Sequence, residues 1–300
     1  MVEGLPRCGF VAIVGAPNVG KSTLLNRLVG AKVSIVTPKV QTTRSRVLGI
    51  CIEGATQLVL VDTPGIFKPR RRLDRAMVAA AWGGSQEADL ILLLVDSAAG
   101  LDADTRAIVK RLQAEDSEAI LALNKVDAVK KTALFKLAAA LDDSGVFIHT
   151  FMVSAKTGSG VPDLLAHLAG AVPEGPWLYP EDQLSDMPGR LLAAEITREK
   201  MYLQLHQELP YASTVETESW KENKDGSVRV EVSVFVERPS QKAIVLGKGG
   251  ARIKAIGEAA RTELEELLER RVHLFLFVKV RKDWGEDPER YRDLGLDYKA

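Results

Sequence analysis

Five short polar segments combine residue types that can hold a phosphate chain, a divalent cation and a purine base. They are GAPNVGKS (15–22), QTTR (41–44), DTPG (62–65), NKVD (124–127) and SAK (154–156). All but QTTR follow an apolar run, at the point where a strand is expected to end. Because ligands of open α/β sheets bind at the carboxyl ends of the strands, we expect these segments to meet at one site.

The segment GAPNVGKS follows the apolar run FVAIVG and precedes a helical pattern, which is the context of a phosphate-binding loop. Its glycines let the backbone curl so that amide groups converge on phosphates, and the helix N-terminus adds partial positive charge. Lys21 would reach the β- and γ-phosphates, and the Ser22 hydroxyl would bind Mg²⁺. The alternative is a glycine-rich turn that binds nothing. The predicted contacts are Gly15, Ala16, Pro17, Asn18, Val19, Gly20, Lys21, Ser22 and Thr23.

The segments DTPG and NKVD carry the carboxylates of the predicted site. Asp62 suits Mg²⁺ through a bound water, and the Gly65 amide would meet the γ-phosphate. Asp127 can accept hydrogens from both the ring N–H and the exocyclic amine of guanine, a donor pair that adenine lacks. The Asn124 amide would donate and accept at the guanine edge. Each segment alone is also an ordinary turn, but the four strand-end segments in order predict a guanine-nucleotide site.

The remaining contacts surround the base and the phosphates. The Lys125 stem would lie over the nucleotide, and backbone amides around Ala155 would hold the guanine carbonyl. The predicted contacts of the later segments are therefore Asp62, Thr63, Pro64, Gly65, Asn124, Lys125, Asp127, Ser154, Ala155 and Lys156.

Together the five segments resemble the P-loop GTPases of the translation-factor class. The resemblance implies that a QTTR threonine completes the Mg²⁺ shell: Thr43 is predicted, with Thr42 as the alternative. The predicted metal ligands are thus Ser22, Thr43 and Asp62, and the predicted catalytic residues are Lys21, Thr43 and Gly65. Ile66 stands where Ras-like enzymes carry a water-orienting glutamine, so we expect slow GTP hydrolysis that a partner, or a potassium ion near Asn18, assists.

Apolar runs separated by helical patterns position these segments. The candidate strands are 10–15, 47–54, 56–65, 89–97, 119–127 and 147–156. Near-continuous apolar strands between helices predict an α/β fold, with a mostly parallel sheet covered by helices on both faces. A proline-rich stretch follows, so the predicted bounds are 1–172 for this domain and 173–189 for a linker.

The rest of the chain has another element order. Helix 190–209, strands 213–222 and 228–236, a helix ending at GKGG (247–250), helix 251–270 and strand 272–280 predict an α+β domain over 190–282, with a tail over 283–300. The valines of 228–236 alternate on one face. The apolar residues of the last strand are expected in the core: Val272, Phe275, Phe277 and Val280.

The segment 245–257 resembles the KH module of the second (type II) topology, in which a GxxG loop joins two helices. Loop glycines let an RNA backbone approach closely, and the following helix start favours phosphate. Residues 238–254 hold five basic and no acidic side chains. The alternative is a glycine-capped helix–turn–helix. The predicted RNA contacts are Lys242, Ile244, Val245, Gly247, Lys248, Gly249, Gly250, Arg252, Ile253 and Lys254.

One GTPase domain followed by one KH domain resembles the Era-type GTPases over nearly the whole chain. The resemblance implies GTP and GDP as ligands, the 3′ end of 16S rRNA as RNA partner, and a role in maturation of the 30S ribosomal subunit. It also allows peripheral attachment to the inner membrane. The alternative function is a nucleotide switch whose C-terminal domain binds a protein or a membrane surface. No lipidation motif or strongly basic amphipathic helix supports the latter.

Composition limits which other classes of protein the chain could belong to. The chain has 300 residues, 46% of them hydrophobic, with 40 basic and 40 acidic side chains. This composition excludes a disordered chain. The longest strongly apolar run of the chain, 90–95, is too short for a membrane helix. The only two cysteines, Cys8 and Cys51, lie far apart and suggest a reducing compartment. We therefore expect a cytoplasmic monomer of two domains.

Overall fold

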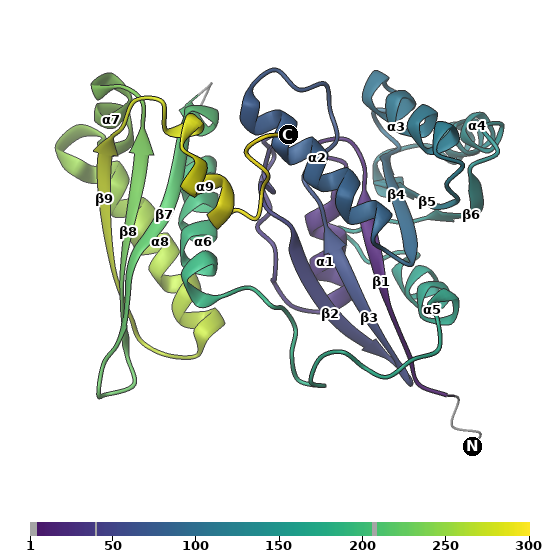
Figure 1. Ribbon diagram of the computed structural model, residues 1–300, viewed down its shortest axis with the longest axis horizontal. Coiled ribbons are helices and arrows are strands. Elements are labelled where there is room, and N and C mark those ends of the chain that lie inside the picture. The colour runs from purple at the N-terminus through teal and green to yellow at the C-terminus, as the bar shows by residue number, and fades with distance from the viewer. Residues whose placement is uncertain (1–4, 40, 206–208) are drawn as a thin grey trace. The chain divides into compact units, whose positions relative to one another are not determined.

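The computed structural model describes residues 5–39, 41–205 and 209–300, which form two compact units (Figure 1). The first unit comprises Met1–Asp186 together with Tyr291–Ala300, and the second comprises Met187–Arg290. Each has its own sheet and its own buried apolar residues, so each is described separately.

The first unit is built on a six-stranded sheet in the order β2-β3-β1-β4-β5-β6. Neighbouring strands run parallel except for β2 and β3, which are antiparallel. Central strands are apolar along their length because both faces of the sheet are covered. This confirms the predicted mostly parallel α/β sheet. The strands are β1 (Arg7–Val14), β2 (Val47–Glu53), β3 (Thr56–Asp62), β4 (Leu90–Asp96), β5 (Ala119–Asn124) and β6 (Phe147–Met152).

Helices cover both faces of this sheet (Figure 1). Trp82 of α2, Ile108 of α3 and Leu141 of α4 join Leu93 and Leu121 of the strands in one apolar cluster. On the opposite face, α1 and α5 contact β2 and β3. The loops that end β1, β3 and β5 therefore start from a rigid three-layer core. The helices are α1 (Lys21–Val29), α2 (Arg72–Gln86), α3 (Ala103–Ala114), α4 (Lys131–Asp142) and α5 (Val161–Ala171).

The proline-rich segment after α5 lies along the first unit instead of standing free. The Gln57 side-chain oxygen of β3 accepts the backbone N–H groups of Leu178 and Tyr179, and the Ile50 N–H donates to the Leu184 carbonyl. The first unit thus continues past the predicted boundary at 172, to Asp186. Beyond β9 the chain forms a short helix, α9 (Pro288–Asp293), and residues 291–300 group with the first unit.

The second unit packs helices on one face of a three-stranded sheet in the order β7-β8-β9. The pair β7–β8 is antiparallel and the pair β8–β9 is parallel. The five alternating valines of β8 are fully buried, as predicted. The predicted element order is also found: α6 (Gly189–Gln204), β7 (Ser213–Glu222), β8 (Val228–Val236), α7 (Pro239–Leu246), α8 (Ala251–Leu268) and β9 (Val272–Val280).

Two expectations for the second unit are wrong. Helix α6 ends at Gln204 and does not run to 209, although residues 206–208 lie outside the described part. Phe275, Phe277 and Val280 are 40%, 44% and 41% exposed instead of buried. The two phenylalanines pair with Glu231 and Ser233 of β8, so they face away from the valines that form the core.

Candidate functional site

The loop between β1 and α1 lines a cavity of about 440 Å³. Gly20 precedes α1 with φ at 104°, and a Cβ there would lie 2.5 Å from Nδ2 of Asn124. Only glycine fits at such a position, and the loop can then turn the amides at the start of α1 toward the cavity. The lining residues are Pro17, Asn18, Gly20, Lys21, Ser22, Thr23, Val36, Thr37, Pro38, Gln41, Thr42, Thr43, Gly65 and Lys125.

Lys21 lies at the base of this cavity, nearly buried. Its ammonium donates to the carbonyl oxygens of Gly15 at 3.1 Å and Ala16 at 3.0 Å. Burial lowers the pKa of Lys21 to about 8, although the charge of Asp62 opposes that shift. A buried ammonium held by two carbonyls can pass those hydrogen bonds to phosphate oxygens.

Nucleotide binding is therefore expected to take up a proton above pH 8. A phosphate chain beside Lys21 raises the pKa of the ammonium, so the complex keeps a proton that the free protein has lost. By linkage, affinity falls as pH rises through about 8, by at most about tenfold per unit. Calorimetry at about pH 8.5 in two buffers of different ionisation enthalpy measures the uptake, which should vanish at about pH 6.5. Equal proton exchange at both pH values would contradict the prediction.

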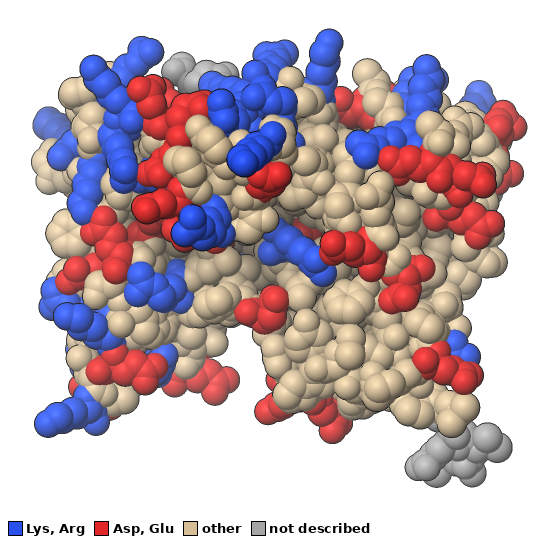
Figure 2. Space-filling model, in the orientation of Figure 1, with Lys and Arg blue, Asp and Glu red and all other residues tan. Residues whose placement is uncertain are grey.

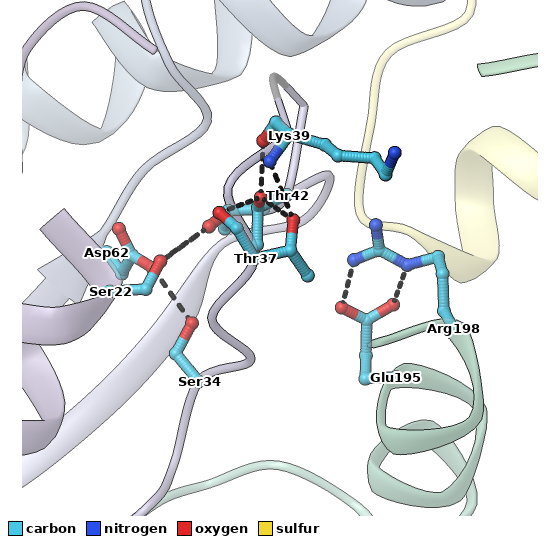
Figure 3. A network of polar contacts seen from close by, with 9 residues as sticks. Ser22, Ser34, Thr37, Lys39, Thr42, Asp62, Glu195 and Arg198 are labelled. Carbon is cyan, nitrogen blue, oxygen red and sulfur yellow. Dashed lines mark hydrogen bonds and ion pairs between the residues drawn. The ribbon is translucent and has the colours of Figure 1, made fainter. Parts of the chain in front are cut away.

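Asp62, the last residue of β3, gathers three hydroxyl groups (Figure 3). Its Oδ2 accepts from Ser22 at 2.6 Å, Ser34 at 2.9 Å and Thr43 at 3.1 Å. Burial raises the pKa of Asp62, and Lys21 and the three hydroxyls oppose that shift. Its Oδ1 is buried without a hydrogen-bond partner in the described part of the chain. A carboxylate oxygen left unsatisfied beside hydroxyls fits a hydrated Mg²⁺ ion, which prefers oxygen ligands.

The two threonines of the QTTR segment point to different partners. The Thr43 hydroxyl lies 2.9 Å from that of Ser22, within the Asp62 cluster. The Thr42 hydroxyl instead lies 2.7 Å from that of Thr37 and donates to the Lys39 carbonyl (Figure 3). The geometry therefore favours Thr43 over Thr42 beside a metal ion. Ser34 belongs to none of the recognised segments, so the sequence analysis missed it.

A second cavity, of about 270 Å³, adjoins the first through Gly20, Thr23 and Lys125. Its mouth carries the exposed carboxylate of Asp127, whose pKa is lowered chiefly by a hydrogen bond from the Ser154 hydroxyl. An ionised carboxylate held in this way can accept from two adjacent donors of a base. The cavity is lined by Gly20, Thr23, Asn124, Lys125, Asp127, Ala128, Ser154, Ala155 and Lys156.

Asn124 has a structural role beside the one predicted at the base. Its Nδ2 donates to the Val19 carbonyl at 2.8 Å, and its Oδ1 accepts from the Ala155 N–H at 2.9 Å. The buried side chain therefore joins the phosphate loop to the SAK loop. Because an amide nitrogen carries two N–H groups and Asn124 lines this cavity, the second N–H stays available to a base.

Lys125 is fixed by a residue that the sequence analysis did not select. Its ammonium donates to Asp96 at 2.7 Å, at the end of β4, and to the Asn18 carbonyl at 2.8 Å. The sequence could have pointed to Asp96, because Asp96 ends an apolar strand in the same way as Asp62 does. The contact of Lys125 with Asn18 ties the NKVD loop to the phosphate loop.

Ile66 cannot orient a water molecule at the phosphates. Its side chain is buried in the apolar cluster with Trp82 and Val14, while its N–H donates to the Gly15 carbonyl at 3.0 Å. Gly65, just before it, lies so close to the phosphate loop that a Cβ there would be 3.0 Å from Cα of Pro17. The DTPG loop therefore presents backbone, not a side chain, to the cavity.

In the second unit, the GKGG loop joins α7 to α8. Gly249 and Gly250 have φ of 59° and 79°, and a Cβ on either would meet no atom within 4 Å, so this backbone is open to a ligand. Lys248 is exposed on the loop. One predicted contact differs, since Val245 is fully buried and faces the core from α7. Arg252 donates from one nitrogen to the Ile244 carbonyl at 2.6 Å.

A groove of about 500 Å³ lies between α8 and β9. Ile253 and Lys254, both predicted, line it with residues that were not predicted, among them Arg261 and Leu276. Gly257 brings the helix and strand close, since a Cβ there would be 3.3 Å from Leu276. Helix α8 contributes two cations to the lining with Glu258 between them, and the strand contributes apolar side chains. Apolar surface next to cations suits a single-stranded nucleic acid. The additional residues are Gly257, Glu258, Arg261, Leu274 and Leu276.

Comparisons with known proteins match both units. A family model described as a 50S ribosome-binding GTPase matches residues 10–125, and a KH domain model matches residues 208–285. A crystal structure of a variant of Aquifex aeolicus Era bound to GDP and AlF4⁻ is 38% identical, with a TM-score of 0.91 over 96% of this chain and 99% of that one. Era in complex with MgGDPNP and nucleotides 1506–1542 of 16S ribosomal RNA is also 38% identical, with a TM-score of 0.92 over 97% and 99%.

Curated relatives match the chain over nearly its full length. GTPase Era of Rhizobium meliloti is 64% identical over 97% of this chain and 93% of its own. GTPase Era of Brucella suis is 61% identical over 97% and 94%. With a GTPase model matched in the first unit, a KH model in the second and relatives 64% and 61% identical over nearly the whole chain, the chain belongs to the Era family of GTPases.

Proposed function

We propose that the chain binds and hydrolyses GTP at the cavity of its first unit. In the same proposal it binds the 3′ end of 16S rRNA in the α8–β9 groove during 30S subunit maturation. The observation that carries this is the presence of both sites on one chain: a phosphate loop with a metal-fitted carboxylate, and a GxxG loop beside an apolar groove. Support comes from the relative solved with MgGDPNP and 16S rRNA nucleotides.

In the nucleotide site, each residue has a separate task. Lys21 moves its hydrogen bonds from the two loop carbonyls to the β- and γ-phosphates, and the Gly65 amide meets the γ-phosphate. Ser22, Thr43 and Asp62 would hold Mg²⁺, which neutralises phosphate charge when bound. Asp127 accepts the guanine donors, while Asn124 and Asp96 position the loops around the base.

Slow hydrolysis follows from the burial of Ile66. With no glutamine-like side chain at this position, a partner must supply the water-orienting group, or a cation near Asn18 must help. We propose potassium as that cation, and faster GTP turnover in KCl than in NaCl would support it.

No helix in the described part of the chain combines the length and hydropathy needed to span a bilayer.

The RNA part of the proposal is tested by binding of a short RNA that ends in the small-subunit 3′ sequence. Binding is measured with a non-hydrolysable GTP analogue and with GDP. We expect at least about tenfold tighter binding with the analogue, which requires about 1.4 kcal/mol of coupling between the two sites. Equal, weak binding in both states would contradict the coupling and leave the second unit as a constitutive anchor or a protein-binding module.

A further inference from the structure

A dense basic segment follows the DTPG loop and lies outside the nucleotide cavity. Residues 68–75 contain five basic side chains and one acidic one, in a chain whose net charge is zero. Lys68, Arg70 and Arg75 are exposed. We call these three side chains the basic surface. Figure 2 shows Lys and Arg side chains gathered where α2 begins in Figure 1.

The single acid of this segment does not neutralise the basic surface. Asp74 is buried and accepts the backbone N–H groups of Arg70 and Arg71, each at 3.0 Å. Its other oxygen accepts from Gln41 at 3.0 Å. Within the described residues, Lys68, Arg70 and Arg75 form no ion pair, whereas the neighbouring Arg72 packs on the ring of Tyr298 at 4.5 Å. Three unpaired cations therefore remain on one short stretch.

We propose that the basic surface binds the phosphate backbone of RNA, as a second contact in addition to the α8–β9 groove. This rests on the proposed function, since the groove makes RNA the polyanion available to this chain. Three like charges held on one loop and one helix turn repel one another, and phosphates relieve that repulsion while releasing counterions. The hydrogen bonds from the Arg70 and Arg71 backbone to Asp74 fix the chain that carries the basic surface, so less conformational freedom of the backbone is lost when phosphate binds.

The basic surface is also tied to the nucleotide site. The Ile66 N–H donates to Gly15 of the phosphate loop, two residues before Lys68, and Gln41 of the QTTR segment donates to Asp74. A γ-phosphate that draws in the DTPG and QTTR loops therefore acts on both ends of this segment. We infer that its contribution to RNA binding is larger in the GTP state than in the GDP state.

The test replaces Lys68, Arg70 and Arg75 by glutamine in the full chain. RNA affinity is measured against salt concentration, with the GTP analogue and with GDP. Loss of three phosphate contacts should reduce the slope of log K against log salt by about 2 with the analogue. Affinity at low salt should also fall. The matched control replaces Lys130, Lys131 and Lys136, three exposed lysines around the start of α4, by glutamine. It should change the salt slope less than the triple variant of the basic surface does.

Three outcomes would overturn this inference while leaving the proposed function intact, provided that wild-type protein binds the RNA. The first is an unchanged slope in the triple variant, and the second is an equal effect of the control. In the third, the variant loses binding to vesicles of anionic phospholipid but keeps its RNA slope, which would make the surface a membrane contact. Failure of wild-type protein to bind RNA at all would instead contradict the proposed function. Unchanged GTP-analogue affinity checks that the variants are folded.

Discussion

Replacing Asp127 by asparagine is expected to change the nucleotide preference from guanine to xanthine. The Asp127 carboxylate lies at the mouth of the base cavity and is held ionised by the Ser154 hydroxyl. The oxygen of the new amide at this position can accept from the ring N–H of guanine. Its NH2 group, however, faces the exocyclic amine of guanine, and two hydrogen-bond donors repel each other. Xanthine carries a carbonyl at that position, which accepts the new N–H. A site built to hydrogen-bond a group rejects a mismatched one by as much as about 10⁴-fold.

Binding of GTP and XTP to both proteins, measured by calorimetry, checks this prediction. The matched control is Asp142→Asn, which makes the same change at an exposed position at the end of α4, outside the lining of either nucleotide cavity. The control should keep its preference for GTP. If Asp127→Asn bound GTP as tightly as wild type and gained nothing for XTP, another residue would have to recognise the base.

The roles of Asp127 and Asn124 show where sequence reasoning about the site succeeds. Motif spacing placed both residues where an apolar strand ends, and in the structure Asn124 is the last residue of β5, with Asp127 three residues on. Spacing could not show that the Asn124 amide bridges Val19 and Ala155, because those partners lie 105 and 31 residues away. Ser34 was missed for the same reason, because its contact with Asp62 is created only by the fold. Asp96 could have been selected from its place at the end of an apolar run, but its partner Lys125 could not.

The fold was predictable wherever one face of an element is buried. The valines of β8 repeat every second residue, and a period of two specifies a strand with one face in the core. Phe275 and Phe277 follow the same period on β9, but hydrophobicity alone does not say which face the helices cover. The segment 173–186 has no period at all. Its order comes from single hydrogen bonds such as those of Gln57 and from the packing of Trp177 and Tyr179 on an apolar cluster of the first unit.

Replacing Gly249 by aspartate is expected to weaken RNA binding strongly while leaving nucleotide binding intact. Gly249 has φ at 59°, which side chains adopt with strain, and nothing lies within 4 Å of its Cβ position. The new carboxylate would therefore occupy the open space in which a phosphate backbone approaches, next to Lys248. Repulsion and the lost contact together should weaken RNA binding by at least about tenfold, and the effect should grow as salt is lowered. Fluorescence anisotropy with labelled RNA measures the loss.

Gly226→Asp is the control that separates charge and strain from position. Gly226 lies between β7 and β8 of the same unit, with φ at 80° and no atom within 4 Å of its Cβ position, so the substitution adds the same charge at comparable strain. It should bind RNA nearly as wild type does. If both variants lost RNA equally, destabilisation of the unit would explain the loss. If neither did, the GKGG loop would not contact RNA. A loss confined to Gly249→Asp that also lessens at high salt would assign the loop to phosphate, because an apolar protein partner would respond little to salt.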